Sequence, residues 1–281
     1  MSTDNYTLTQ DELIICDYEL GINIALPFNV PRLSVSLQGE GHVRDQDFEG
    51  NLRCVYLVAD GRRHGECRLF ADEGKLRAEM YYLHGKLHGP SIMYGDKGEV
   101  LAKTWYCDGK RVGKAQFYYP SGALSSTQRF KEGQWEGVQD YYYESGSMKS
   151  QIPFRGGKLH GEVRLFWESG NLKRSVHYVD GLREGFDRMW NEHGVLFDEG
   201  EYRSGQPHGI HRHYFSDGKV KEELNYHSPS RFDRKEWNAS GKLLFEGIFS
   251  SDLTYTEKVY LEPQGTKVRK GVWDGNRIRW S

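Results

Sequence analysis

The sequence predicts an all-β protein: an elongated array of β-hairpin repeats forming a twisted antiparallel sheet, with a capping segment at each end. Two observations carry this prediction. Glycine recurs with a period of 24 residues, and apolar residues between the glycines alternate with polar ones. Such a period is typical of arrays in which each unit packs on its neighbours. The three glycine series are Gly61, Gly85, Gly109, Gly133, Gly157, Gly181 and Gly205; then Gly65, Gly89, Gly113, Gly137, Gly161, Gly185 and Gly209; then Gly74, Gly98, Gly122, Gly146, Gly170, Gly194 and Gly218.

The unit at residues 171–194 shows why a hairpin is predicted. Its first apolar run extends from Leu172 to Tyr178 with even spacing, which is the periodicity of a strand. Asp180-Gly181 starts a tight connection of hairpin length, and a second run reaches Trp190. Glycine suits such turns because short hairpin loops need a positive φ, which other residues reach only at a cost. Two strands at about 4.8 Å each would lengthen the array by roughly 10 Å per unit, to on the order of 70–80 Å.

The phase of the repeat divides the chain into three parts. It extends over residues 41–249, about eight units, of which the last is degenerate. Residues 1–40 are out of phase and are expected to cap the first repeats. Residues 250–281 are expected to supply closing strands, since the end units of a repeat protein face water on one side.

The composition excludes several classes of partner and compartment. Charge is nearly balanced, with 38 Lys+Arg against 40 Asp+Glu, so no strong field favours nucleic acid or an anionic membrane. The four cysteines form no C-x-x-C pair, and the last three, Cys54, Cys67 and Cys107, occupy different repeat phases, which favours reduced thiols. No secretory signal is recognisable, and no run approaches the roughly 20 apolar residues of a membrane span. We expect a cytoplasmic protein, with export by a specialised bacterial secretion system as the alternative.

The hairpin turns carry a recurring motif, Y-x-x-G-K-L-x-G. It occurs as residues 82–89 and, with Phe in first place, as residues 154–161. Together with the aromatic residues and the glycine and leucine that follow, it closely resembles the MORN repeat family in its bacterial 24-residue variant. The resemblance covers about residues 41–249 and implies an array of β-hairpins. Families with such repeats include membrane-junction scaffolds, lipid-kinase accessory regions and bacterial antitoxins, so function does not follow from the fold.

No catalytic motif accompanies the repeats. A G-x-x-x-x-G-K-[ST] phosphate loop, H-E-x-x-H and G-x-S-x-G are all missing from the sequence, so neither an enzyme nor a cofactor is predicted. Histidine recurs before the second glycine, but neighbouring units about 10 Å apart are too distant to share one metal. His211 and His213 share a strand face, yet no carboxylate or Cys partner is obvious, so no metal site is predicted. The recurring histidines are His64, His88, His160 and His208.

Aromatic residues supply the candidate binding surface. One column, from Tyr94 to Tyr214, is aromatic in every unit, as a structural core requires. The next position is aromatic in only four units, which favours a binding role, since Tyr and Trp are enriched at interfaces. Coverage of this surface by the N-terminal segment or by a second copy of the chain is the alternative. The predicted partner-binding residues are Phe117, Tyr119, Tyr141, Tyr143, Leu165, Trp167 and Phe215.

An arginine stripe is the second candidate surface. Arg164, Arg188 and Arg212 recur three residues after the second glycine on adjacent units. A guanidinium at each of these positions could contact phosphate or an acidic partner. The alternative is a solvated face balanced by nearby carboxylates.

These observations favour a non-enzymatic binding platform that presents residues 113–217 to a protein partner. An antitoxin that neutralises a toxin is the alternative within binding proteins, and a phospholipid-binding module at a membrane surface is the alternative from another class. The identity of the partner and the oligomeric state are not predicted.

Overall fold

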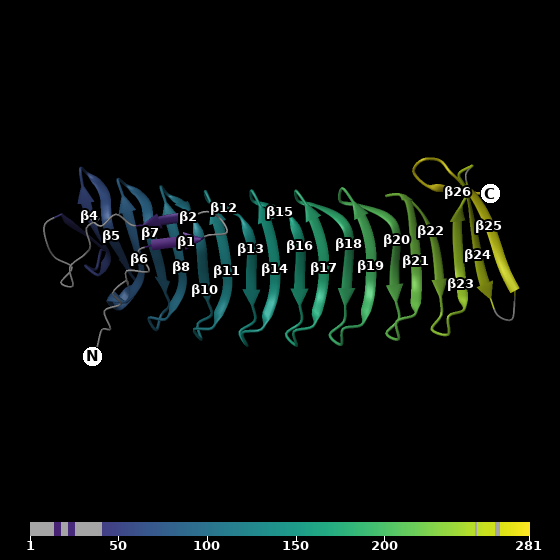
Figure 1. Cartoon of the computed structure of the whole chain (residues 1–281), viewed down its shortest axis with the longest axis horizontal. Helices are drawn as coiled ribbons and strands as arrows, with labels where there is room; N and C mark the ends of the chain where they lie inside the picture. The colour runs from purple at the N-terminus through teal and green to yellow at the C-terminus, as the bar shows by residue number, and fades with distance from the viewer. Residues whose placement is uncertain (1–13, 18–21, 26–40, 251, 262–264) are drawn as a thin grey trace. The chain divides into compact units, whose positions relative to one another are not determined.

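The structure is a computed structural model that describes residues 14–17, 22–25, 41–250, 252–261 and 265–281 (Figure 1). Apart from β1 and β2, the predicted N-terminal cap lies outside the described residues. The strands are β1 (Ile14–Asp17), β2 (Ile22–Ala25), β3 (His42–Gln46), β4 (Leu52–Ala59), β5 (Arg62–Phe70), β6 (Leu76–Leu83), β7 (Lys86–Tyr94), β8 (Val100–Cys107), β9 (Lys110–Arg111), β10 (Gly113–Tyr118), β11 (Leu124–Lys131), β12 (Gln134–Trp135), β13 (Gly137–Tyr142), β14 (Met148–Arg155), β15 (Lys158–Leu159), β16 (Gly161–Phe166), β17 (Leu172–Val179), β18 (Leu182–Trp190), β19 (Leu196–Arg203), β20 (Gln206–Tyr214), β21 (Val220–Ser228), β22 (Arg231–Trp237), β23 (Leu243–Phe249), β24 (Thr254–Leu261), β25 (Gly265–Trp273) and β26 (Ile278–Trp280). A single 3-10 turn, η2 (Asp72–Gly74), is the one helical element among the described residues.

The predicted fold class is confirmed. Strands β3 to β26 belong to one 24-stranded sheet, and β1 pairs with β2 in a separate hairpin. Strands that are neighbours in the sheet pair antiparallel, as β17 does with β18 through Val179 and Leu182. The even spacing of apolar residues in the sequence therefore corresponds to strands, and each 24-residue unit contributes a hairpin to the sheet.

The hairpin turns explain the first glycine series. In the β17–β18 turn Asp180 has φ 49° and Gly181 has φ 90°, so both central residues are left-handed. Glycine adopts this conformation without strain. The N–H of Gly181 donates to the carbonyl of Leu159 in the preceding hairpin at 2.8 Å. The equivalent glycines at residues 85, 109, 133, 157 and 205 make the same bond to their preceding hairpins. This series therefore serves both the turn and the contact between successive repeats.

Two faces of the sheet are distinguished by repeat position. In each repeat, face A carries the residue three positions after the glycine of the second series, such as Gln116 or Arg188. Face B carries the residues directly before and after that position in the strand, such as Asp187, which precedes Arg188, and Phe117, which follows Gln116. Directly paired residues of antiparallel strands project to the same side, so the register assigns each strand residue to a face.

By its contacts the chain divides into two compact units. Unit 1 comprises Met1–Met148 and Pro153–Lys158, and unit 2 comprises Lys149–Ile152 and Leu159–Ser281. Strand β14 therefore contributes to both. The division predicted from the repeat phase, with boundaries at residues 40 and 249, stays a prediction.

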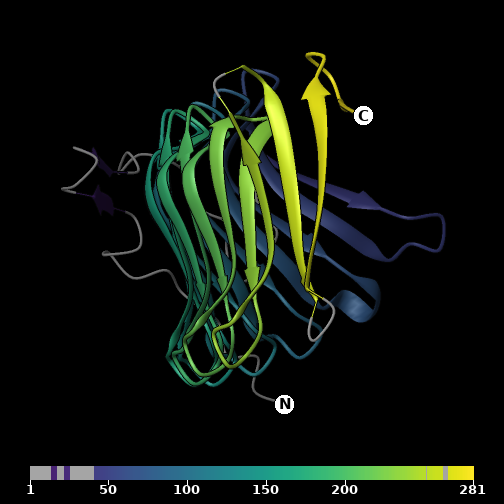
Figure 2. The ribbon, with the colours of Figure 1, turned by 90° about the vertical axis from the view of Figure 1, so that its right-hand side faces the viewer.

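A buried apolar cluster of unit 1 lies on face A. Tyr81, Trp105 and Val112 form a buried cluster there, and Ile24 of β2 packs against it. The β1–β2 hairpin accordingly lies to one side of the sheet, not in line with its strands (Figure 2). Ile24 thus covers the face opposite to the one that carries Phe117.

Candidate interaction surfaces

Phe117 and Tyr141, two of the predicted partner-binding residues, lie on face B of unit 1. Phe117 of β10 and Tyr141 of β13 both pair with Ser126 of β11, which lies between them. The three residues therefore form one row across the strands, with a small side chain between two rings. Both rings are half-buried, and burial raises the pKa of Tyr141.

Met93 extends this row and is absent from the set predicted from the sequence. It pairs with Ala102 of β8, which in turn pairs with Phe117. Its side chain is 55% exposed. Met93 occupies the repeat position of Phe117 one unit earlier, so the 24-residue spacing could have identified it.

Leu165 lies on face B of unit 2 in different surroundings. It pairs with Ser150 on one side and with Arg174 on the other. Beyond Arg174 the row continues through Met189 to Asp198. In unit 2 this row therefore contains charged residues, whereas in unit 1 Ser126 is its one polar member between Met93 and Tyr141 apart from the Tyr141 hydroxyl.

The four aromatic residues of the irregular column open a turn between repeats. In each case the backbone N–H donates to the carbonyl four residues later, and the glycine three residues later donates back. The Tyr119 hydroxyl also donates to the carbonyl of Tyr142 at 2.8 Å, and Trp167 Nε1 donates to the carbonyl of Trp190 at 3.1 Å. These two side chains therefore bond the next repeat. The four residues are Tyr119, Tyr143, Trp167 and Phe215.

In three other repeats the equivalent turn begins with Asp47, Asn191 or Asn238. Asn191 Oδ1 accepts hydrogen bonds from the backbone N–H groups of His193 and Val195, both at 3.0 Å. Asp47 and Asn238 accept the equivalent pairs of bonds. An Asx side chain thus stabilises the turn from within. The irregular occupation of this column has a structural explanation and does not by itself identify binding residues.

On face A of unit 2, strand pairing aligns charged residues of alternating sign. We name this row the charge ladder. Arg212 Nε donates to Glu223 Oε2 at 2.8 Å, and Arg188 Nε lies 3.2 Å from Glu199 Oε2. Opposite charges placed directly across from each other stabilise strand pairing by roughly 0.2–1 kcal/mol per pair. The ladder consists of Arg188, Glu199, Arg212, Glu223, Lys235, Glu246 and Lys258, one residue from each of β18 to β24.

The predicted arginine stripe belongs to this row. Arg164 reaches Arg188 through Ser175, with which both pair, and its own Nε donates to Glu162 Oε2 at 2.8 Å. Each of the three predicted arginines therefore contacts a carboxylate. This pairing reduces the positive charge that they offer to an incoming anion.

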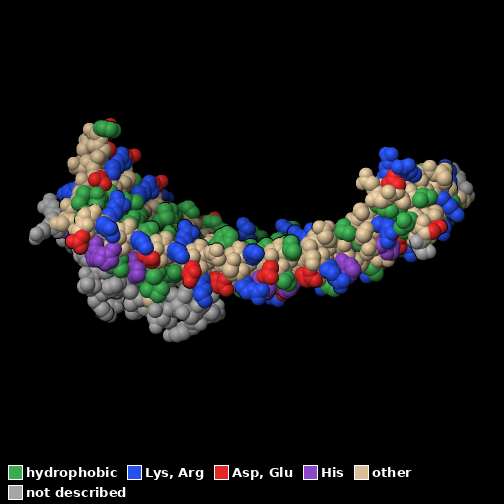
Figure 3. Space-filling view, turned by 90° about the horizontal axis from the view of Figure 1, so that it is seen from above, with side chains coloured by type: hydrophobic (Ala, Val, Ile, Leu, Met, Phe, Trp, Pro, Cys, Tyr) green, Lys and Arg blue, Asp and Glu red, His purple; other side chains and the backbone are tan. Residues whose placement is uncertain are grey.

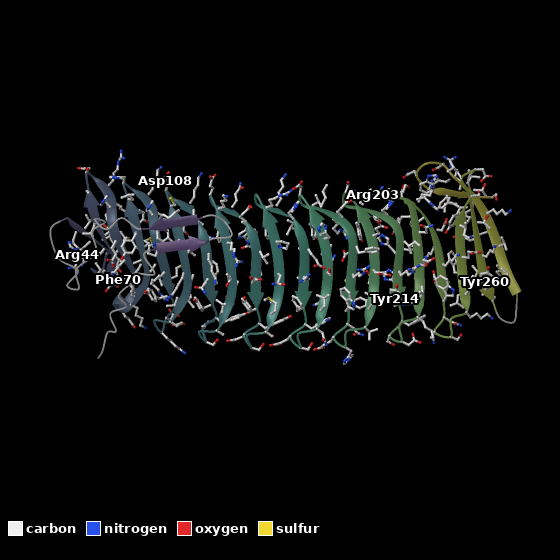
Figure 4. The ribbon with its side chains drawn as sticks, in the orientation of Figure 1. Arg44, Phe70, Asp108, Arg203, Tyr214 and Tyr260 are labelled. Carbon is white, nitrogen blue, oxygen red and sulfur yellow. The ribbon has the colours of Figure 1, made fainter. Side chains whose placement is uncertain are left out.

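Tyr214 connects the every-unit aromatic column to the ladder. It lies at the end of β20 remote from the hairpin turn that Arg203 enters (Figure 4). Its hydroxyl donates to Glu199 Oε1 at 2.7 Å. Burial would raise the pKa of Glu199, but the hydrogen bonds from Tyr214 and Arg188 outweigh it and lower that pKa. The ladder carboxylate is thus held ionised between its partners.

Exposed apolar side chains flank the ladder on face A. Phe186 precedes Arg188 by two residues and is 46% exposed, and Ile210 precedes Arg212 by two residues and is 41% exposed. The Arg188 guanidinium carbon lies 4.2 Å from the Phe186 ring centroid. We name Phe186, Ile210, Arg188, Glu199 and Arg212 the ladder surface. Its two apolar members were not predicted from the sequence, because neither belongs to an aromatic column and their exposure follows only from the register.

Buried charge on face B of unit 2 is paired. Arg174 donates from Nε and Nη2 to the two oxygens of Asp187, at 2.8 and 2.6 Å, and Arg183 Nη1 lies 3.3 Å from the same carboxylate. A bidentate pair of this kind satisfies both partners geometrically. These groups form a structural network that holds β17 against β18.

The histidines near residue 211 have partners that the sequence did not reveal. A carboxylate partner that was not obvious from the sequence is present, because His213 Nδ1 lies 2.5 Å from Asp198 Oδ2. His211 Nε2 lies 2.7 Å from the carbonyl oxygen of Glu201, and burial lowers the pKa of His211. Within the described residues, no group of three or more His, Cys, Asp and Glu side chains is arranged to hold a metal ion.

The histidines of the hairpin turns bond the following repeat. His88 Nδ1 accepts from the backbone N–H of Asp108, and His160 Nδ1 accepts from that of Asp180, both at 3.4 Å. Figure 3 looks onto this edge of the sheet and shows histidines together with side chains of both charge signs. A turn contact therefore accounts for the histidines at residues 88 and 160, whereas Nδ1 of His64, at the same repeat position, has no hydrogen-bond partner among the described residues.

Hairpins of one repeating unit, linked turn to turn by the same backbone bonds, define a β-hairpin repeat protein. The family model for the MORN repeat variant matches residues 63–84, 111–132, 135–155, 159–180 and 207–228. The chain is therefore a MORN repeat protein. Repeats of this family in general serve as protein- or lipid-binding modules.

More distant similarity was found among solved structures. The crystal structure of TcdB2-TccC3-TEV matches at 11% identity, and the Photorhabdus luminescens Tc holotoxin pore with a mutated TccC3 matches at 12%. In each case 85% of this chain aligns with 16% of the other, at a TM-score of 0.15. A TM-score this low carries no argument about fold or function. No curated protein matches the chain.

Among the described residues, no helix has the length and apolar character that crossing a bilayer requires.

Proposed function

We propose that this chain is a non-enzymatic platform that binds a protein partner through the ladder surface on face A of unit 2. The observation that carries the proposal is the exposure of Phe186 and Ile210 one repeat apart on a single face. Singly exposed apolar residues are normal on protein surfaces, whereas apolar side chains gathered beside ordered polar groups are typical of interaction sites.

The charge ladder favours a protein over an anionic membrane. Its arginines and lysines alternate with carboxylates and are bonded to them. Attraction to an anionic leaflet depends on unpaired basic residues, at about 1 kcal/mol each. A protein interface instead uses arginine and aromatic side chains surrounded by polar groups of both signs. Phe186 with Arg188 above its ring supplies that combination.

The proposal keeps part of the surface inferred from the sequence. The ladder surface lies within residues 113–217, the segment expected to face a partner. The face B row of Met93, Phe117 and Tyr141 in unit 1 is a second candidate, and the exposure of Met93 favours it. The buried Asp187, held by Arg174 and Arg183, supports a structural and not a catalytic use of the charged network.

Affinity capture with matched variants tests the proposal. The wild type, Phe186→Asp, Ile210→Asp and Val138→Asp are each immobilised and exposed to lysate of the source organism. Val138 is the control because it has the same repeat position in unit 1 and is 37% exposed. A protein retained by the wild type and by Val138→Asp, but lost from the other two, is the expected result.

Equal retention of that protein by the wild type and all three folded variants would contradict the proposal. Sedimentation with phosphatidylserine vesicles is the parallel measurement. Vesicle binding that depends on Phe186 and Ile210 would show that the ladder surface binds lipid and not a protein. Capture of a toxin through the ladder surface would specify the antitoxin role.

A further inference from the structure

Two cysteines meet on face B of unit 1, in the hairpin formed by β4 and β5. Cys54 pairs with Leu69 and Cys67 pairs with Tyr56, so the two cysteines are diagonal neighbours across the strands. Their Sγ atoms lie 3.6 Å apart. The two cysteines occupy different repeat phases, which argued against a shared site in the sequence. They differ in phase because they lie on the two strands of one hairpin, and the register of these strands brings the two side chains together.

The two thiols are not equivalent. Cys67 is fully buried, whereas Cys54 retains 6% exposure. A hydrogen bond from Cys67 lowers the pKa of the Cys54 thiol against the opposing effect of burial, and the Arg63 guanidinium adds to the lowering. The same contact, together with burial, raises the pKa of Cys67. Cys54 is therefore the better nucleophile, since the thiolate is the reactive form.

We propose that Cys54 and Cys67 form an oxidation site that takes a small peroxide oxidant and closes to an intramolecular disulfide. The Cys54 thiolate attacks one oxygen of hydrogen peroxide, which breaks the O–O bond, forms a sulfenic acid and releases hydroxide. The Cys67 sulfur then attacks the Cys54 sulfur, and the hydroxyl group and the Cys67 proton depart as water. Two thiols are oxidised by two electrons in all, and one peroxide is reduced to two waters.

The geometry suits this order of events. Only Cys54 has to meet the oxidant, because the attack by Cys67 takes place inside the protein. A disulfide needs the sulfurs about 2.05 Å apart, so the present contact has to close by roughly 1.5 Å. The bridge would fasten β4 to β5, next to β3. Cys107 provides an internal control, because it packs against the Tyr81 cluster on face A.

Peptide mapping of the folded protein tests the proposal. The chain is treated with hydrogen peroxide, its remaining thiols are alkylated, and it is digested with trypsin. Cleavage after arginine yields peptides 54–62 and 64–68, each with one of the two cysteines. The expected product is this pair joined together, two hydrogens lighter than the sum of the free peptides, with Cys107 still alkylated.

Variants assign the roles of the two thiols. Cys67→Ser is expected to leave Cys54 as a sulfenic acid that a dimedone probe traps, whereas Cys54→Ser leaves Cys67 reduced. Two results would overturn the proposal: both cysteines remaining alkylatable in the folded, peroxide-treated protein, or a bridge from either one to Cys107. The same bridge at equal yield in urea-unfolded chain would show that the fold does not direct it.

Discussion

Gly200→Ala provides a sharp test of the packing on face B of unit 2. Gly200 lies in β19 with ordinary strand backbone and pairs directly with His211 of β20. A Cβ atom at residue 200 would lie 2.5 Å from Cε1 and 2.7 Å from Cγ of His211, closer than real Cβ atoms approach other atoms. The imidazole therefore has to move to admit a single methyl group.

The cost of that movement follows from what His211 contacts. It would lose the bond to the Glu201 carbonyl, about 0.5–1.5 kcal/mol, and its edge-on ring contacts with Tyr202 and Tyr226, about 0.5–1.5 kcal/mol each. Replacing glycine by alanine within a strand by itself raises the free energy of unfolding by roughly 0.5–1 kcal/mol. We expect the free energy of unfolding to fall by about 1–3 kcal/mol.

Urea denaturation of a double-mutant cycle measures this coupling. In the His211→Ala background the clash is absent, so Gly200→Ala should be neutral or stabilising by up to about 1 kcal/mol. The sign of the effect thus depends on His211. Equal destabilisation by Gly200→Ala in both backgrounds would refute the reasoning, because the methyl group would then be meeting something other than the imidazole.

Four further predictions concern the turns, the ladder and pH. Trp167→Phe removes the donor to the Trp190 carbonyl and should lower the free energy of unfolding by about 0.5–1.5 kcal/mol, measured in urea. Asn191→Ala removes two turn bonds and should cost about 1 kcal/mol in the same assay. Arg212→Ala should cost at most about 1 kcal/mol, less at high salt, because its ion pairs are partly exposed. Because the pKa of His211 is lowered in the fold, its stability contribution is full above about pH 6.5 and lost as the pH falls below that value, so His211→Gln should flatten this part of a melting-temperature profile.

The hairpin architecture could be predicted from the sequence because its determinants are local. The alternation from Leu172 to Tyr178 and the Asp180-Gly181 turn specify a strand and a turn without reference to distant residues. The contact between successive hairpins is also periodic, so one turn glycine predicts the others. The succession of hairpins can therefore be predicted from one unit.

The charge ladder could not be predicted from the same columns, because its members come from different positions of the repeat. Arg188 and Glu199 meet only once the register of β18 against β19 is known, and a bulge at Trp190 shifts that register by one residue. Residues 24 apart occupy equivalent positions, so the repeat period relates arginine to arginine and glutamate to glutamate but not one set to the other. A slip of one residue would have moved either set to the other face.

The irregular aromatic column shows a different limit of the sequence argument. A position filled by an aromatic residue in some repeats and by Asx in others looked variable, and variability favoured binding. Tyr119 bonds the carbonyl of Tyr142 in the next repeat and Asn191 bonds the backbone of its own turn, so the variation also has a structural explanation. The signal was available in the sequence, since Asn or Asp three residues before a turn glycine is typical of an Asx turn.

Footprinting of the captured complex tests the docking proposal most directly. Hydroxyl-radical labelling, with and without the partner, reports the exposure of single side chains on both faces. The account predicts that the partner protects Phe186 and Ile210 and leaves Met93, Phe117 and Tyr141 unchanged. Protection of the face B row with unchanged labelling at Phe186 and Ile210 would contradict it and assign the interface to unit 1.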